Sequence, residues 1–289
     1  MRWLSFGQPG GERPGVLLPD GGVLDVAGQW PHGPRTWRGV LAREGGLARL
    51  ERIIADGGFA ARHVLALEDL QLAPPVPGPS KVIALGRNYP AHAAEQQRTV
   101  RAEPLLFAKA PSCLVGNRAD VVVPPQESRP DYEAEMALLI GRRASAVPQS
   151  AALAHVVGVT AFNDVSGRAA QFGDKLWLRG KSFDTFGPIG PWAVTLDEIG
   201  DPDALALTCD INGERRQAAS TAEMAFSAAA IVSYISHQMT LEPGDVIATG
   251  TPAGVGVFRD PPTFLMDGDE MVVTLEGVGR LCNRIVRRA

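Results

Sequence analysis

Short runs of apolar and β-branched residues, each bounded by glycine or proline, are the feature that most constrains the fold of this chain. Runs of this length between turn-forming residues are typical of β-strands. Those expected to be strands are residues 81–85, 120–123, 135–140, 156–161 and 271–275. The pattern therefore predicts a β-rich α+β fold with few helices.

One clear helix interrupts these strands. Its apolar side chains recur at spacings of three and four residues, which places them on one helix face. The expected N-cap is Ser220 or Thr221, because a hydroxyl oxygen can accept a hydrogen bond from the first backbone N–H groups. The turn Glu242-Pro243-Gly244-Asp245 must end the helix. The residues of the apolar face are Met224, Ala228, Ile231, Val232, Ile235 and Met239.

Residues 1–72 are expected to form a small N-terminal α/β module. It contains a strand-like piece at residues 15–18, a turn at residues 19–22 and a helical stretch from about residue 37 to 57. These pieces precede the strand-rich part of the chain and differ from it in pattern.

A proline-rich segment then separates this module from the rest. Four prolines fall within residues 74–79. Proline cannot continue a helix or a central strand. We therefore expect residues 73–80 to be a linker and residues 81–289 to be a second, larger domain.

The charge and cysteine content disfavour several classes of protein. The formal net charge is −4 with both signs spread along the chain, so there is no basic stripe for nucleic acid. Cys113, Cys209 and Cys282 are far apart and form no CxxC pair, which argues against a disulfide framework and a thiolate metal site. No apolar run has the length of a signal peptide or a membrane span. We therefore expect a cytoplasmic protein with no nucleic-acid or membrane partner.

Residues 86–95 form the first stretch that could do chemistry. It follows an expected strand and opens a short helix with Pro90 near its first position. His92 and Glu95 are three residues apart, so their side chains can meet on one helix face. A carboxylate beside an imidazole makes the ring more basic and fixes its orientation, as a general base acting on water requires. The alternative is a solvated helix with no catalytic role.

Two glutamates stand at the start of the expected strand 135–140. Glu133 and Glu135 are two residues apart, so on a strand they point to the same face. Two like charges so close are unfavourable unless a cation lies between them. Oxygen-only ligands suit Mg²⁺, Mn²⁺ or Ca²⁺ rather than Zn²⁺. The alternative is an exposed acidic strand edge.

A third stretch, residues 161–171, ends another expected strand. Asp164 could be a third carboxylate ligand, although Asn-Asp after a strand commonly forms a turn or a helix cap. Ten residues beyond Gln171 lies Lys181. An isolated lysine is commonly a surface group, so its assignment depends on the motifs around it.

Together these segments resemble the fumarylacetoacetate hydrolase family over residues 81–286. Seven signature pieces occur in the order found in that family, which leaves little room for coincidence. They are Gly86-x-Asn88-Tyr89-x-x-His92-x-x-Glu95, Phe107-x-Lys109, Asp131-Tyr132-Glu133-x-Glu135, Asn163-Asp164-Val165-Ser166, Gly180-Lys181-Ser182-Phe183-Asp184, Pro188-Ile189-Gly190-Pro191 and Leu241-Glu242-Pro243-Gly244-Asp245-Val246-Ile247-x-Thr249-Gly250-Thr251-Pro252-x-Gly254-Val255-Gly256.

The resemblance implies a set of metal and catalytic residues. Glu133, Glu135 and Asp164 are implied to be ligands of Mg²⁺, with Mn²⁺ or Ca²⁺ as alternatives. His92 and Glu95 are the implied catalytic dyad, on a mobile lid that orders over the ligand.

The resemblance also implies the residues that meet a substrate. Lys181 is the implied catalytic cation beside the charge that develops in the reaction. Thr251 and its glycine neighbours are the implied backbone cradle for the substrate carboxylate. The implied substrate-binding residues are Arg87, Tyr89, Lys109, Gln171 and Thr251.

This sequence departs from the family pattern in two places. The larger members use a fourth carboxylate ligand that has no match here. After the serine of Asn-Asp-Val-Ser many members carry Ala-Arg-Asp, whereas this chain has Gly167-Arg168-Ala169 and lacks the acid. The hydrogen bonds of this loop, and substrate preference with them, are therefore in question.

The resemblance further implies the fold and the assembly. The implied fold is a mixed β-roll with few helices, and the implied assembly is a homodimer. A small N-terminal domain occurs in many bacterial members of about this length.

The implied substrate is a small 2-oxo acid, which can chelate Mg²⁺ through its carboxylate and 2-oxo oxygen. Breaking a C–C bond beyond C3 leaves a pyruvate enolate, whose charge Mg²⁺ and Lys181 would stabilise. Residues 180–191 look most like those of hydrolases of sugar-derived 2,4-dioxo acids, so we favour C–C bond hydrolysis of the acylpyruvate type. The alternatives are oxaloacetate-type decarboxylation, isomerisation or hydration of a 2-oxo acid, and a non-catalytic family member.

Overall fold

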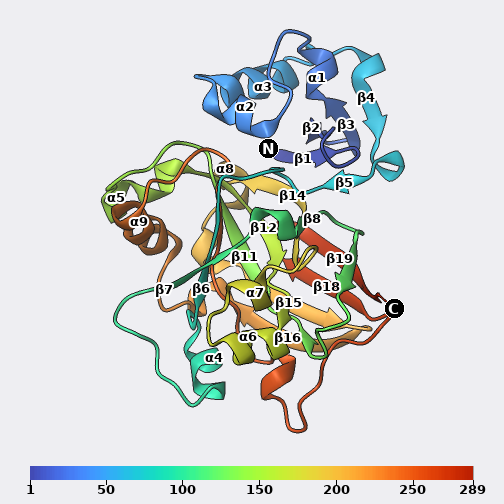
Figure 1. Ribbon diagram of the computed structural model, residues 1–289. Coiled ribbons are helices and arrows are strands. Elements are labelled where there is room, and N and C mark those ends of the chain that lie inside the picture. Colours follow the sequence, from blue (N-terminus) through green and yellow to red (C-terminus); the bar gives the residue numbers. More distant parts are fainter. Residues whose placement is uncertain (289) are drawn as a thin grey trace.

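The computed structural model describes residues 1–288, and its largest element is a twelve-stranded mixed sheet (Figure 1). Two short strands, β5 (Leu72–Ala73) and β8 (Leu114–Val115), pair with β1 and β14 of this sheet. The other strands, from edge to edge, are β4 (Val64–Ala66), β3 (Gly22–Asp25), β2 (Arg13–Leu17), β1 (Arg2–Phe6), β14 (Gly187–Thr195), β12 (Val156–Asn163), β11 (Ala134–Ile140), β17 (Val246–Ala248), β6 (Val82–Gly86) and β7 (Leu105–Lys109).

A second sheet of five strands covers part of the first, and a two-stranded ribbon lies near the site described below. The ribbon joins β10 (Pro130–Asp131) to β13 (Ser166–Gly167). The five strands, in order, are β16 (Glu214–Ser220), β15 (Ala206–Ile211), β18 (Glu270–Leu275), β19 (Gly279–Arg287) and β9 (Asp120–Val123). The predicted β-rich α+β fold is confirmed.

Strand β11 is buried on both faces, which explains its continuous apolar run. Alternate side chains of a strand point to opposite faces. Met136 and Leu138 therefore lie in the core shared with the second sheet, whereas Ala137 and Leu139 lie in the core that contains Trp37 of the N-terminal part. The strand thus carries its first residues into the interior of the molecule.

The N-terminal strands continue the main sheet. Strand β1 pairs antiparallel with β14, with Arg2 opposite Val194 and Trp3 opposite Ala193. Figure 1 shows these strands and the first helices at the top of the molecule, beside the rest of the sheet. The domain boundary at residues 73–80 and the homodimer stay predictions.

The helices are short and lie at the periphery. Within residues 1–288 no helix combines the length and the hydropathy that crossing a bilayer requires. The α-helices are α1 (Val26–Gln29), α2 (Trp37–Ala42), α3 (Gly46–Ala55), α4 (Pro90–Glu95), α5 (Gln149–Ala152), α6 (Arg168–Asp174), α7 (Leu178–Lys181), α8 (Leu196–Ile199) and α9 (Ala228–Gln238), and the 3₁₀ turns are η1 (Ala61–His63), η2 (Leu67–Asp69), η3 (Pro111–Cys113), η4 (Leu153–His155), η5 (Pro202–Ala204), η6 (Thr221–Glu223) and η7 (Gly256–Phe258).

Two predicted helix limits are wrong. The stretch 37–57 is split into α2 and α3, because Arg43 is extended directly after α2 and Gly45, with a left-handed φ of 64°, precedes the first residue of α3. Helix α9 is capped by Ser227, whose side chain accepts from the Ala230 N–H. Ser220 instead caps the short turn η6 in a capping box with Glu223.

Candidate active site

Three carboxylates meet where the beginning of β11 lies beside the end of β12. The two strands pair antiparallel, with Glu135 opposite Phe162. Glu133 and Glu135 therefore come close to Asp164, which follows β12 directly. One ligand oxygen from each lies within 4.8 Å of the others, and all three side chains are buried. The structure thus brings together the acidic trio that the sequence predicted.

Lys181, at the end of α7, holds a positive charge in this carboxylate group. Its Nζ donates to Glu133 Oε2 over 2.7 Å and to Asp164 Oδ2 over 2.6 Å. Burial opposes the ionisation of Glu133, but the charges of Lys181 and then Arg168 outweigh it and lower the pKa of Glu133 to about 2. Glu133 is therefore a stable carboxylate at neutral pH.

Glu135 differs from the other two carboxylates, because the donor that it contacts is a backbone N–H and not a charged side chain. One of its oxygens accepts from the Gly250 N–H over 2.8 Å, and Oε1 is buried without a donor among residues 1–288. Burial, followed by the charges of Asp164 and Glu133, raises the pKa of Glu135 well above its usual value. An orphaned acceptor beside two further carboxylates fits a divalent cation with oxygen ligands. The trio can therefore hold such a metal ion.

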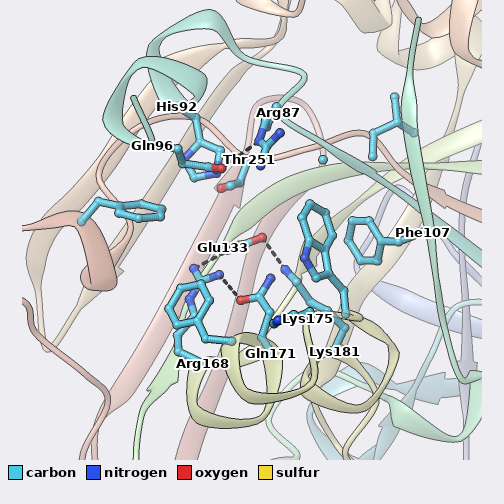
Figure 2. A pocket seen from close by; sticks show the side chains of 15 residues that line it. Arg87, His92, Gln96, Phe107, Glu133, Arg168, Gln171, Lys175, Lys181 and Thr251 are labelled. Atoms are coloured by element: carbon cyan, nitrogen blue, oxygen red, sulfur yellow. Dashed lines mark hydrogen bonds and ion pairs between the residues drawn. The ribbon is translucent and has the colours of Figure 1, made fainter. Parts of the chain in front are cut away.

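A cavity of about 280 Å³ opens beside the carboxylates, and Figure 2 shows the side chains around it. It contains most of the predicted site residues. His92 and Arg87 lie on one side in Figure 2, and Lys181 and Gln171 on the other. The predicted residues that line the cavity are Arg87, His92, Glu133, Gln171, Lys181 and Thr251.

Two predicted substrate-binding residues lie behind this lining. The Lys109 Nζ donates to Asp164 Oδ1 over 2.6 Å and to the Phe186 carbonyl over 3.0 Å, and it also contacts the Lys181 carbonyl. The Tyr89 hydroxyl is buried and has no hydrogen-bond partner in the part of the chain that the structure describes, and burial raises the pKa of this group. Lys109 thus orients Asp164 and the end of α7 instead of facing the cavity.

His92 and Glu95 meet on one face of α4, as predicted. Pro90 occupies the first turn of this helix, where its missing N–H costs nothing. The His92 Nδ1 lies 3.1 Å from Glu95 Oε2. The other Glu95 oxygen accepts from the Gly254 N–H over 2.7 Å, which ties α4 to the loop that carries Thr251.

Gln217 of β16 connects the Thr251 loop to the first residue of β11. Gln217 Nε2 donates to Thr251 Oγ1 over 2.8 Å, while its oxygen accepts from the Ala134 N–H. Gly250 has φ of 100°, and a Cβ there would lie 2.9 Å from the Cβ of Asn88. Only glycine suits that position, because other residues would meet both strain and a clash.

Arg168 is a site residue that the sequence analysis did not single out. Its guanidinium donates twice to Asp131 Oδ2, at 3.0 and 2.8 Å, and pairs with Glu133 Oε1 at 2.7 Å. It also donates to Gln171 Oε1 over 2.9 Å and so orients that side chain at the cavity. The sequence offered one signal for it, because Arg168 lies in the stretch 161–171 between Asp164 and Gln171.

Glu127 provides a carboxylate beside Ala169, where the resemblance expects an acid. Its two oxygens accept from the backbone N–H groups of Ala169 and Ala170, each over 3.1 Å. It is 1% exposed, and it also accepts from the Arg129 N–H. The first turn of α6 therefore has an anionic acceptor from another segment, as the positive end of a helix favours.

A comparison with protein-family models decides the family. The model described as fumarylacetoacetate (FAA) hydrolase, C-terminal, matches residues 81–286. The chain belongs to the fumarylacetoacetate hydrolase family. The resemblance carried by the sequence motifs is thereby confirmed, and the β-rich fold is the one found in this enzyme family.

Similar members of the family carry names of different reactions. An oxaloacetate tautomerase of Bos taurus, described as mitochondrial, is 39% identical over 99% of this chain and 92% of its own length. The 2,4-didehydro-3-deoxy-L-rhamnonate hydrolase of a Sphingomonas strain is 38% identical over 96% of this chain and 94% of its own length. The crystal structure of maleylpyruvate hydrolase from Sphingobium has a TM-score of 0.80 at 30% identity and covers 100% of both chains. Membership of the family therefore does not identify which reaction a member catalyses.

Proposed function

We propose that the protein is a Mg²⁺-dependent hydrolase that cleaves the C3–C4 bond of a 2,4-dioxo acid and releases pyruvate. The supporting observation is that two different kinds of group border the cavity. His92, backed by Glu95, lies on one side, and Lys181 lies on the other, with Glu133 between them (Figure 2). Such a site suits a reaction in which water attacks one carbon while negative charge develops at another.

The carboxylate side of the cavity is the proposed place of the pyruvate half. Glu133, Glu135 and Asp164 would hold Mg²⁺, which supplies Lewis-acid stabilisation of negative charge on a 2-oxo acid. The Lys181 ammonium already donates to two of these carboxylates, so it adds a fixed positive charge beside the same half of the substrate.

His92 is the proposed base at the other side. Its Nε2 takes a proton from water, and the hydroxide oxygen bonds to the C4 carbonyl carbon while the π pair of the C4 carbonyl moves to its oxygen; this pair re-forms the carbonyl as the C3–C4 bond breaks. The C3–C4 bond then breaks, its electron pair moves to C3 as a pyruvate enolate, and protonated His92 returns the proton to C3. One water molecule is consumed, and the products are pyruvate and a carboxylic acid.

The size and lining of the cavity favour a small, polar substrate. Its volume of about 280 Å³ lies near the lower end of small-molecule sites, which start at roughly 300 Å³. Gln171, Lys175 and Thr251 offer polar groups, and the rings of Phe107 and Trp177 close one wall. A short hydroxylated chain beyond C4, as in a sugar-derived acid, meets both conditions.

His92→Ala tests the proposal. Hydrolysis of an acylpyruvate should fall by a factor on the order of 10²–10⁴, because the water loses its base. Mg²⁺ affinity by calorimetry should stay unchanged, and oxaloacetate decarboxylation, which needs no water, should fall less. The matched control is His237→Ala, since His237 is exposed on α9. Equal hydrolysis by the two variants would show that water is activated elsewhere.

Oxaloacetate keto–enol tautomerisation is a second candidate. It is favoured by the 39% identity to an oxaloacetate tautomerase over nearly the whole chain. The reaction moves a proton between C3 and the 2-oxo oxygen and needs no attacking water, so the same base and the same cation could serve it. Loss of enol absorbance from oxaloacetate without release of pyruvate, and no turnover of any 2,4-dioxo acid, would favour this candidate over the hydrolase.

A further inference from the structure

A chain of hydrogen bonds connects the imidazole of His92 to Gln96 and Arg87 (Figure 2). Arg87 Nε donates to Gln96 Oε1 over 2.9 Å. Gln96 Nε2 lies 2.8 Å from His92 Nε2, and His92 Nδ1 lies 3.1 Å from Glu95 Oε2. Gln96 lines the cavity and has no role in the reaction proposed above.

Each bond in this chain can run in one direction only. A guanidinium nitrogen can only donate, so the amide oxygen of Gln96 must face Arg87. The amide nitrogen therefore faces His92 and donates to Nε2. A carboxylate can only accept, so the Nδ1–H of His92 donates to Glu95. The ring proton of His92 consequently lies on Nδ1, and Nε2 carries the lone pair.

Both ends of the chain are anchored in the body of the protein. At one end the Gly254 N–H donates to Glu95. At the other end Arg87 has φ of 58°, a left-handed backbone that non-glycine residues rarely adopt. The next residue, Asn88, is buried and fixes this turn, because it donates to the Thr249 carbonyl and accepts from the Phe226 N–H. The strained turn therefore points Arg87 at Gln96.

Glu95 alone cannot fix the state of the ring. It accepts from Nδ1–H in the neutral ring, and equally in an imidazolium whose Nε2 also carries a proton. Gln96 excludes a proton on Nε2, because its own N–H would then face another N–H. The Gln96 amide, as a donor to Nε2, is therefore the group that keeps this nitrogen unprotonated.

We propose that Gln96 is a positioning residue that holds His92 as the Nδ1–H tautomer and so keeps Nε2 available as the base. The proposal rests on the proposed function of His92 in hydrolysis. The attacking water takes the place of the Gln96 amide on Nε2 when substrate is bound, because one lone pair accepts one hydrogen bond. Gln96 thus keeps His92 Nε2 unprotonated until water replaces the amide.

Gln96→Glu reverses the polarity of this contact without changing its size. The new carboxylate accepts from Arg87 and favours a proton on His92 Nε2. The hydrolytic kcat should fall by a factor on the order of 10²–10⁴, as when the base is removed, while KM and Mg²⁺ affinity change little. The matched control is Gln97→Glu, which adds the same charge at an exposed neighbour and should leave all three quantities as in the wild type.

The ¹⁵N signals of the imidazole report the tautomer directly, in the full chain without substrate. The protein has five histidines, so the His92 signals are assigned by their loss in His92→Asn. The wild type and Gln97→Glu should show a protonated Nδ1 and an unprotonated Nε2, and Gln96→Glu should show a protonated Nε2. Gln96→Met, which neither donates nor adds charge, should lose activity to a smaller extent and provides the test if Gln96→Glu does not fold.

The proposal is overturned if wild-type His92 carries its proton on Nε2. It is also overturned if Gln96→Glu and Gln97→Glu have the same nitrogen signals and the same kcat. If the wild type hydrolyses no 2,4-dioxo acid, the proposed function fails, and the nitrogen signals of the resting protein still decide the role of Gln96.

Discussion

Glu135→Gln should stabilise the metal-free protein and abolish its stabilisation by Mg²⁺. One oxygen of Glu135 accepts from the Gly250 N–H, and the other is buried without a donor. Burial, and then Asp164 and Glu133, raise the pKa of this carboxyl well above its usual value. Glutamine keeps the size of the side chain and removes its charge. The cost of burying that charge therefore disappears, together with one metal ligand.

The spacing of the carboxylates sets the magnitude. Their ligand oxygens lie within 4.8 Å of one another. Two unit charges at about that distance interact by about 3 kcal/mol at an effective dielectric constant of about 20. Glu135 is repelled by Asp164 and Glu133, and the attraction of Lys181 offsets roughly one of these terms. We expect the variant to gain on the order of 1–3 kcal/mol of unfolding free energy in EDTA at about pH 8.

The gain depends on pH in a defined direction. Because the folded-state pKa of Glu135 is raised, the folded chain keeps a proton that the unfolded chain releases above about pH 4. In EDTA the wild type should therefore lose stability relative to Glu135→Gln as the pH rises from about 4 towards the raised pKa. The difference should shrink towards about pH 4, where the carboxyl is protonated in both states.

Urea denaturation in EDTA and in Mg²⁺ measures both effects. At a Mg²⁺ concentration of about 100 times Kd the wild type should gain about 2.7 kcal/mol, and the variant should gain nothing. The order of stability of the two proteins should therefore approach equality or reverse on adding Mg²⁺. A variant that is less stable than the wild type in EDTA would refute the argument from buried charge. A variant that gains as much stability from Mg²⁺ as the wild type would refute Glu135 as a metal ligand.

Two further substitutions test the supports of the site. Arg168→Met should lower the unfolding free energy, measured by urea denaturation, by about 3–5 kcal/mol, because Asp131 and Glu133 lose a buried partner. The control Arg179→Met breaks an exposed ion pair and should change the unfolding free energy little. Equal losses in the two variants would contradict the argument. Glu127→Ala should cost about 1–2 kcal/mol and raise KM more than it lowers kcat, because α6 carries Gln171 to the cavity. Thermal unfolding and steady-state kinetics check the second variant, and an unchanged KM would show that α6 needs no anionic acceptor.

Several elements could be predicted because their signals are local. The strands expected at 120–123 and 135–140 agree with β9 and β11 within one residue, since their apolar runs end at glycine, proline or charged residues. The two helix errors have a physical reason. Residues 37–57 are interrupted by the extended Arg43 and the left-handed Gly45. The apolar periodicity of the later helix includes Met224, but Ser227 offers the cap from which α9 begins.

The supports of the site had no local signal. Glu127 lies 42 positions before Ala169 in the sequence, and no spacing rule connects a carboxylate to backbone amides so far away. The pair of Arg168 and Asp131 likewise joins two segments that only the ribbon of β10 and β13 brings together. Lys109 and Tyr89 belong to quoted motifs, yet motif membership does not say which side chains reach the cavity and which lie behind it.

The sequence by itself determined which groups are available and which of them share a face. Glu133 and Glu135 point the same way because a strand has a period of two, and His92 meets Glu95 because a helix brings residues three apart together. Only the tertiary structure decided that the side chains of Asp164 and Lys181 contact each other beside the glutamates and that Gln96 contacts His92. The register between β11 and β12 and the packing of α7 against β7 and β13 set the contacts of the carboxylates with Lys181. Such contacts depend on hydrogen bonds and burial between distant segments, which residue spacing does not encode.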